Sequence, residues 1–286
     1  MDELFEVLRF GFMQRALVAG ALVALMSGLL GTFVVQRRLS FLGDGLAHAA
    51  FGGMGVGALA IVSAGLLGAG AGVLRSPLWI ALPFALLTAL GIAYVRDRTD
   101  LSSDTAIGVF FAVSVALGVL AFSRIPPDVN LGFNVMDLLF GSILAVRAVE
   151  LGAIVTAAAI VVAVLGATWG RLAYATFDDE LARTDGVRSR RLEYLLFALS
   201  AVAVAVSAVV VGIVLMAAYL VIPAATARLW SRSLAGTSVR AVAIGVATTV
   251  IGVIGSFYLD APTGSAIILS QAAVFVAAVA TRRRSG

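Results

Sequence analysis

Long hydrophobic runs, separated by short polar stretches, extend along almost the whole chain. A transmembrane helix needs about 20 consecutive apolar residues to cross the hydrocarbon core of a bilayer, and nine runs approach or meet that length. They are Arg15–Val35, Asp44–Leu67, Pro77–Val95, Thr105–Phe122, Leu151–Thr168, Leu192–Val210, Gly212–Leu229, Val239–Phe257 and Gly264–Ala280. The pattern predicts an all-α protein, a polytopic bundle of about nine transmembrane helices.

Two stretches depart from the pattern of single apolar spans. The run from Leu192 to Leu229 is too long for one span and just long enough for two, and we expect the break at Gly212 because glycine allows a tight turn. Residues 131–146 form a weaker amphipathic stretch, which we interpret as an external, re-entrant segment. No polar stretch is long enough for a second domain, so residues 1–286 are expected to form one membrane domain.

Composition supports the membrane assignment and excludes several chemistries. The chain is 61% hydrophobic and 13% charged, far from the composition of soluble globular proteins. All its basic residues are arginine, and cysteine is absent. Without lysine there is no phosphate-binding loop of the usual kind, and without cysteine there are no thiolate ligands for a metal. We therefore expect no ATP hydrolysis by this chain itself, no enzymatic activity and no bound cofactor.

The arginines lie between the apolar runs, where they set membrane topology rather than bind nucleic acid. The loop from Gly170 to Arg191 holds five of them and is assigned to the cytoplasm, which places 15 of the 20 arginines on that side. Cytoplasmic loops of membrane proteins carry such an excess. We predict an external N-terminus and a cytoplasmic C-terminus, as an odd number of spans requires.

The single histidine of the chain, His48, follows Asp44 by four residues. On a helix this spacing places the carboxylate and the imidazole on one face, with Cβ atoms about 5–6 Å apart, which suits two ligands of one divalent cation. The structural alternative is that Asp44 caps the helix and His48 bonds a neighbouring carbonyl. Ionisable residues inside a bilayer are costly and commonly functional, but the spacing alone leaves both interpretations open.

Two further irregularities interrupt the apolar runs. Asp260 lies in the segment Phe257–Gly264, together with a proline and a glycine; broken helices often bind ions at their ends, and an ordinary external turn is the alternative. Pro223 lies inside a span, where it frees a backbone carbonyl and kinks the helix, and the Thr226 hydroxyl is expected to satisfy part of that loss. A gating element and a static packing kink both fit Pro223.

The long polar loop contains signals for a short helix. Thr176 is typical of a helix N-cap, Asp178, Asp179 and Glu180 place acids in the first turn, and basic residues follow Gly186. These features predict a cytoplasmic helix over about residues 176–187.

Four ordered stretches resemble the permease family of the ABC transporters that take up zinc, manganese and iron. They are Arg37–Asp44 with His48–Ala49, Ala175–Asp178 with Ala182 and Gly186–Val187, Leu220–Arg228, and Tyr258–Gly264. The resemblance covers almost the whole chain. It implies the transmembrane subunit of an ATP-driven importer in a prokaryotic cytoplasmic (inner) membrane, with zinc as the first expected cargo and manganese or iron next.

The same resemblance implies partners and site residues. The family forms a homodimer in the lipid bilayer, with two copies of a cytoplasmic ABC ATPase and an extracytoplasmic metal-binding protein. Asp44, His48 and Asp260 match its metal-path residues. Residues that match its ATPase-coupling helix are Thr176, Phe177, Asp178, Asp179, Glu180, Ala182 and Gly186. Phe51–Gly53 departs from the apolar-Pro-Gly pattern of many manganese-type members, which weakly disfavours manganese.

Two other function classes fit the residues less well. A proton-coupled secondary metal transporter would use Asp44 and His48 as ligands and proton relay, but it needs no docking helix in the cytoplasm. An intramembrane aspartyl protease would use Asp44 and Asp260 as a pair of acids that share a proton. That class requires glycine two residues before the first aspartate, where this chain has Leu42.

Overall fold

The computed structural model describes residues 9–65, 78–127, 129, 141 and 143–281. Within these ranges no strand occurs, and nine helices are long and apolar enough to cross a membrane. The nine are α2 (Gly11–Gln36), α3 (Leu42–Ser63), α4 (Leu78–Arg98), α5 (Ser103–Ser123), α7 (Ala148–Phe177), α9 (Ser189–Val211), α10 (Ile213–Trp230), α11 (Leu234–Tyr258) and α12 (Thr263–Thr281). The predicted all-α, polytopic fold is confirmed.

In the same described ranges, two short helices accompany the nine long ones. The 3-10 helix η1 covers Ile143–Ala145, and α8 covers Asp179–Thr184. Most of the predicted re-entrant segment, residues 131–146, lies outside the described residues, and η1 belongs to its described remainder. α8 lies within the predicted loop helix but is shorter, because α7 continues as far as Phe177 before the chain turns.

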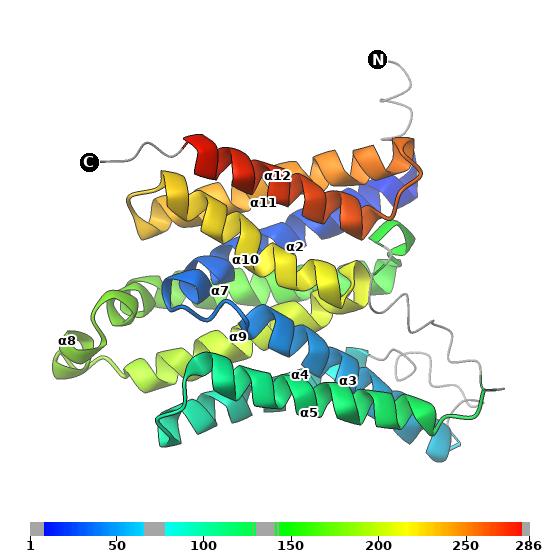
Figure 1. Ribbon diagram of the computed structural model, residues 1–286, viewed down its shortest axis with the longest axis horizontal. Helices are drawn as coiled ribbons and strands as arrows, with labels where there is room; N and C mark the ends of the chain where they lie inside the picture. Colours follow the sequence, from blue (N-terminus) through cyan, green and yellow to red (C-terminus); the bar gives the residue numbers. More distant parts are fainter. Residues whose placement is uncertain (1–8, 66–77, 128, 130–140, 142, 282–286) are drawn as a thin grey trace.

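α9 and α10 meet at a single residue. Gly212 has φ 85° and ψ 154°, a backbone conformation that is essentially open to glycine alone. Its N–H donates to the carbonyl of Ala208 and closes α9, and α10 begins at the next residue. The predicted break at this glycine is therefore confirmed, and the two helices diverge from it as a V (Figure 1).

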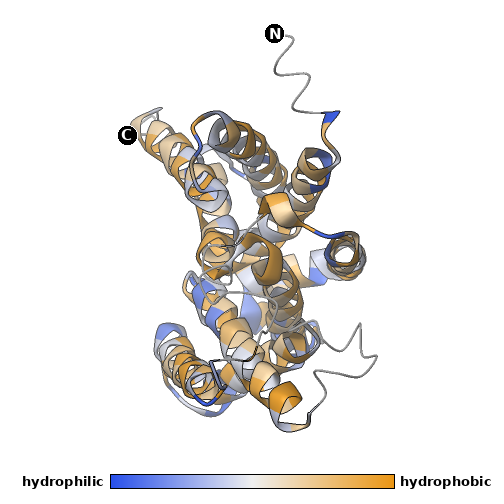
Figure 2. Cartoon of the chain, turned by 90° about the vertical axis from the view of Figure 1, so that its right-hand side faces the viewer, coloured by the Kyte–Doolittle hydropathy of each residue, from blue (hydrophilic) through white to orange (hydrophobic). Residues whose placement is uncertain are grey.

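The long helices pack in two groups, which α9 and the contact between α3 and α10 join. α3, α4 and α5 pack together, α2, α10, α11 and α12 pack together, and α7 lies against α2 and α9. Figure 1 shows α2 beginning at one end of the bundle and α12 ending at the other, the end that also holds α8. An odd number of spans accounts for this; that the α8 end is cytoplasmic is a prediction from the arginine count. In the view along the bundle (Figure 2), hydrophobic residues dominate the helices, as contact with lipid requires.

Glycines determine how closely α3 approaches its neighbours. A Cβ atom on Gly52 would lie 2.5 Å from the carbonyl oxygen of Ser114 in α5. On another side of α3, a Cβ atom on Gly53 would lie 2.9 Å from the Cα of Ala81 in α4. Small residues permit such backbone contact between membrane helices, so these glycines serve close packing.

Gly52→Ala should lower the thermal stability of the purified protein. The added methyl group meets backbone atoms of Ser114, which cannot rotate away, and overpacking of this kind costs about 1–3 kcal/mol. Gly108→Ala in α5 is the matched control, because nothing lies within 4 Å of its added Cβ atom. Thermal unfolding in detergent measures both variants, and equal stability of the two would contradict the packing account.

Candidate functional site

The connection between α2 and α3 determines how the candidate ligands enter the bundle. The N–H of Leu39 donates to the carbonyl of Val34 at 2.9 Å, a bond typical of the Schellman turn that ends many helices. Arg38 holds the left-handed position of that turn, with φ 58°. α3 then begins at Leu42, with Phe41 as its N-cap. A defined turn, rather than an irregular loop, therefore precedes the first turn of α3.

Asp44 and His48 occupy the first two turns of α3 on the same face. Their side chains are 43% and 21% exposed, whereas residues 45–47 and 49–50 are buried. The Oδ1 atom of Asp44 lies 3.4 Å from Nδ1 of His48. Phe41 is the N-cap, and no side chain bonds to the cap position. The predicted shared face is confirmed, and Asp44 is not the helix cap that the structural alternative required.

Besides the Asp44 carboxylate, two further contacts hold the His48 ring. Its Nδ1 lies 3.0 Å from the main-chain oxygen of Asp44, and because a carbonyl only accepts hydrogen bonds, Nδ1 carries the proton in this contact. A neutral ring then keeps its lone pair on Nε2, as in metal-binding histidines whose other nitrogen is held by a carbonyl. The ring of Phe111 in α5 packs against the imidazole, with centroids 4.5 Å apart. The carbonyl bond of the structural alternative is thus present, but it does not use Nε2.

The packing of Gly43 shows where this part of α3 lies. A Cβ atom on Gly43 would lie 3.3 Å from Cβ of Leu220 and 3.6 Å from Cα of Ala217. Both residues belong to the first half of α10, a helix of 18 residues. The first turn of α3 therefore lies beside the interior of a membrane-spanning helix and not beside its end, so Asp44 and His48 are within the apolar bundle.

Asp260 lies elsewhere, in the turn between α11 and α12. It has φ 47°, and the next N–H, that of Ala261, donates to the carbonyl of Ser256 at 3.1 Å, so Asp260 holds the left-handed position of a helix-ending turn. Tyr219 precedes Leu220, the α10 residue that meets Gly43, and it bonds Thr249 of α11 at 2.5 Å. About 15 Å of helix separates Thr249 from Asp260. Among the described residues, no three or more histidine, aspartate and glutamate side chains form a group that could hold a metal ion. Within one chain, Asp260 is not brought to Asp44 and His48.

Pro223 is buried inside α10. Its ring removes the hydrogen bond to the carbonyl four residues earlier. The Thr226 hydroxyl donates instead to the carbonyl of Ile222 at 2.7 Å, so the predicted compensation by Thr226 is wrong. α2 meets the same part of α10, where a Cβ atom on Gly31 would overlap the carbonyl oxygen of Leu220. The segment before Pro223 is therefore in backbone contact with α2.

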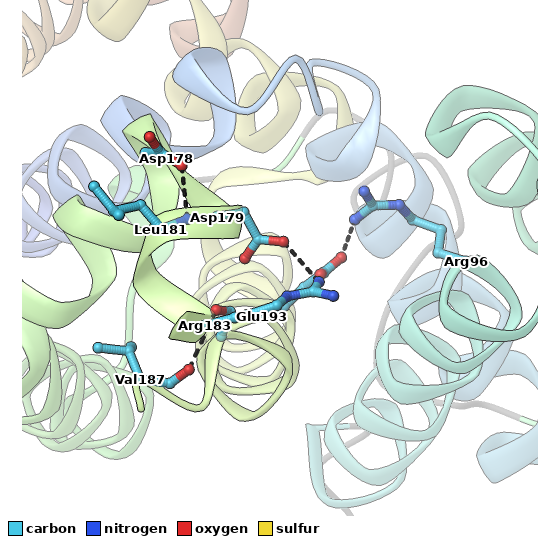
Figure 3. A network of polar contacts seen from close by, with 8 residues as sticks. Arg96, Asp178, Asp179, Leu181, Arg183, Val187 and Glu193 are labelled. Carbon is cyan, nitrogen blue, oxygen red and sulfur yellow. Dashed lines mark hydrogen bonds and ion pairs between the residues drawn. The ribbon is translucent and has the colours of Figure 1, made fainter. Parts of the chain in front are cut away.

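The short helix α8 is closed at both ends by hydrogen bonds (Figure 3). Oδ1 of Asp178 accepts from the N–H of Leu181 at 2.9 Å and caps its start. At its end Gly186 has φ 81°, and the N–H of Val187 donates to the carbonyl of Ala182 at 2.9 Å. These bonds explain why so short a helix forms at the end of the bundle.

Thr176 is not the cap that the sequence predicted. It lies in the last turn of α7, and its hydroxyl donates to the carbonyl of Leu172 at 2.6 Å. The reason is that α7 continues through Phe177, so the capping position falls on the next residue. Phe177 and Leu181 are 64% and 51% exposed, whereas Ala182 is fully buried. The α8 region therefore anchors itself through a small residue and presents two large apolar side chains outward.

Several contacts around these residues were missed by the sequence analysis. Nε of Arg37 donates to Oγ1 of Thr176 at 2.9 Å, and Arg96 of α4 pairs with Glu193 of α9 (Figure 3). The available signal was an arginine directly after an apolar run, which was read only as a topology marker. No sequence pattern predicted which residues these arginines would contact, and none predicted that Phe111 packs against His48.

Comparisons with known proteins extend over nearly the whole chain. The probable iron transport system membrane protein of Haemophilus influenzae is 33% identical over 280 residues, 98% of this chain and 97% of that protein. The manganese transport system membrane protein MntC of Listeria innocua is 28% identical, over 94% of this chain and 90% of that protein. The high-affinity zinc uptake system membrane protein ZnuB of Haemophilus influenzae is also 28% identical, over 96% of this chain and 99% of that protein.

A solved structure agrees with the helix arrangement described above. PsaBC from Streptococcus pneumoniae, in complex with Fab, is similar with a TM-score of 0.80 and 28% identity, over 97% of this chain and 94% of that chain. The model of the ABC 3 transport family matches residues 9–282, which include Asp44 and His48, the helix α10 with Pro223, and α8. With a match of that extent, the chain belongs to the ABC 3 transport family, as a multi-pass membrane protein with nine long apolar helices in the part that the structure describes.

Proposed function

We propose that this chain is the permease subunit of an ATP-driven importer and that it passes a divalent transition metal ion across the cytoplasmic membrane. One observation carries the proposal: Asp44 and His48 share the open face of α3 inside an apolar bundle. Ionisable residues at such positions are costly and mark ion pathways in transport proteins. Relatives named for iron, manganese and zinc transport support the class of cargo.

The proposed cargo site uses a carboxylate oxygen of Asp44 and Nε2 of His48. Nitrogen and oxygen donors accept zinc, manganese and ferrous iron. In a homodimer the symmetry axis supplies the same pair from the second subunit, so two pairs would surround one ion. A transport site must also release its ion, which favours a few carboxylate and imidazole ligands over thiolates. The ion is the cargo and not a resident cofactor.

In this proposal a separate ATPase supplies the energy. Two copies dock on the α8 helices of the dimer, where Phe177 and Leu181 provide an exposed apolar surface. Closure of the ATPases displaces α8, and the two subunits rock about the cargo site between outward and inward access. Pro223, directly after the segment in contact with α2, is the proposed gating element. An extracytoplasmic metal-binding protein delivers the ion.

The metal itself stays at the level of a class. The sequence argument against manganese rested on Phe51–Gly53, where Gly52 replaces the proline of many manganese-type members. A Cβ atom at Gly52 would meet the Ser114 carbonyl oxygen, so close packing against α5 already accounts for this glycine. That departure is therefore no argument against manganese, and the expectation of zinc as first cargo remains a prediction that uptake measurements decide.

The alternatives are less well supported. Membership in an ABC transport family disfavours a proton-coupled carrier. A protease dyad requires two acids close enough to share a proton, whereas Asp44 lies beside the interior of α10 and Asp260 lies in the turn after α11. The difference in depth, about 15 Å along the helices, is too large for that chemistry.

Asp44→Asn and His48→Ala should each abolish metal uptake, because each removes one of the two cargo ligands of a subunit. Cells carrying the variants as the sole copy of this chain are grown with limiting metal, and their zinc, manganese and iron contents are measured by mass spectrometry. Val56→Ala, further along α3, is the control and should retain uptake. Normal accumulation of all three metals by the His48 variant would remove the proposed cargo site; loss of folded protein in both variants would support the structural alternative instead.

Two substitutions at Asp260 distinguish a structural role in the turn from a role in the cargo site. If its role is the left-handed backbone position, Asp260→Gly keeps the turn and raises stability by up to about 1 kcal/mol, because glycine adopts that conformation without steric cost, and uptake stays near normal. If the carboxylate contacts the cargo, Asp260→Gly and Asp260→Asn both lose uptake at normal yield. Metal content and thermal stability of the two variants distinguish these results.

Glu180→Arg should uncouple ATP hydrolysis from transport. The substitution reverses one exposed charge on α8 and leaves the capping bond of Asp178 intact, so the permease should insert normally while the ATPase contact weakens. Asp100→Arg, a charge reversal outside α8, is the control. ATPase activity and metal uptake are measured on the assembled transporter, and unchanged uptake by the Glu180 variant would contradict docking on α8.

A further inference from the structure

Arg37 joins the end of α2 to the end of α7, directly before α8. Its Nε donates to Oγ1 of Thr176 at 2.9 Å, and Thr176 in turn donates to the carbonyl of Leu172. One turn earlier on α2, the ring of Phe33 packs edge-on against Trp169 of α7, with centroids 4.9 Å apart. Two successive contacts therefore hold the ends of these helices together.

The guanidinium of Arg37 is partly buried and incompletely paired. In the described part of the chain its Nη2 atom is buried without a hydrogen-bond partner. Burial lowers the pKa of Arg37, against the opposing effect of the nearby Glu193 and Asp179 carboxylates. Both acids already have partners, since Glu193 pairs with Arg96 and Asp179 lies 2.6 Å from Arg183. An unpaired donor on a buried cation is costly, so this arrangement is not explained by stability alone.

The position of Arg37 in the chain connects it to the cargo face. It is the C-cap of α2, and the bond from Leu39 to Val34 fixes the turn that follows. Asp44 lies in the first turn of the next helix. A displacement of Arg37 is therefore passed on through a short, hydrogen-bonded connection rather than through a slack loop.

We propose that Arg37 is a positioning residue of transport, which carries the movement of α8 through its bond with Thr176 to Asp44 and His48. The inference rests on the proposed function. Its physical element is an exchange of partners: when α8 moves, the Asp179 carboxylate leaves Arg183 and engages the unpaired Nη2 of Arg37. Such an exchange gives the junction two discrete arrangements, as a switch between access states requires.

Thr176→Val tests the bond with little change of shape. The substitution removes the hydroxyl that accepts from Arg37, whereas Thr176→Ser keeps it. Thr168→Val is the matched control, because Thr168 lies on the same helix and makes the same local bond, to the Val164 carbonyl at 2.7 Å. Arg37→Gln removes the other partner, and the double variant shows whether the two act as one unit.

The measurement is metal transported per ATP hydrolysed, by the permease with its ATPase and its metal-binding protein in proteoliposomes supplied with zinc, manganese or ferrous ions. We expect Thr176→Val and Arg37→Gln each to lower this ratio about fivefold or more, the lower bound of usual coupling between sites. Thr176→Ser and Thr168→Val should stay near the wild-type ratio. The double variant should be no worse than the Arg37 variant alone.

Three results would overturn the inference: a wild-type ratio for Thr176→Val, an equal loss in Thr168→Val, or a double variant whose loss is the product of the single losses. If Arg37→Gln yields no folded protein, the comparison of valine and serine at Thr176 decides. A wild-type chain that transports none of the three metals would overturn the proposed function, and this inference with it. If the wild-type chain transports metal, and Thr176→Val and Arg37→Gln keep the wild-type ratio of metal to ATP, only this inference is overturned.

Discussion

Hydrogen bonding of the backbone inside lipid is the constraint on which the rest of this structure depends. An unpaired N–H or C=O group in hydrocarbon costs several kcal/mol, so each described span is helical, and between residues 143 and 281 the irregular backbone lies at helix ends. Arg38, Gly186 and Asp260 hold left-handed positions where helices end, and Gly212 joins two helices directly. The candidate functional elements, the first turns of α3 and the helix α8, lie next to such ends because only there can the chain change direction.

Close packing of helices is the second consequence of the same surroundings. Lipid is as apolar as the side chains, so helices associate through van der Waals contact, and small residues allow their backbones to meet. Gly43, Gly52 and Gly53 bring α3 against α10, α5 and α4. Packing on three sides buries most of the first turns of α3 and leaves Asp44 and His48 on the remaining face. The placement of the candidate ligands is thus a product of glycine packing as much as of their own spacing.

The sequence predicted the parts of the structure that local patterns encode. The lengths of the apolar runs predicted the nine long helices, and the four-residue spacing predicted the shared face of Asp44 and His48. The end of α7 could not be read in this way, because the helix continues beyond its apolar run until Asp178 caps the next one. The contacts of Arg37 with Thr176 and of His48 with Phe111 join distant parts of the chain. The periodicity of hydrophobic positions in a single sequence does not predict such long-range contacts.

Asp44 and Asp260 differ in how far local structure accounts for an acid at each position. Asp260 is exposed and stands at a left-handed backbone position, where aspartate is several-fold enriched over most residues, so the turn is a sufficient reason for an aspartate there, and its role in the metal path stays a prediction. Asp44 makes no capping bond, and a carboxylate in the first turn of a helix gains only about 0.3–1 kcal/mol from the helix dipole. A charged side chain at the centre of a membrane helix costs about 2.5–3.5 kcal/mol, and Asp44 lies in the first turn of α3 with its side chain 43% exposed. The helix dipole offsets only part of such a cost, which is the physical reason for proposing a cargo role for Asp44 beside His48.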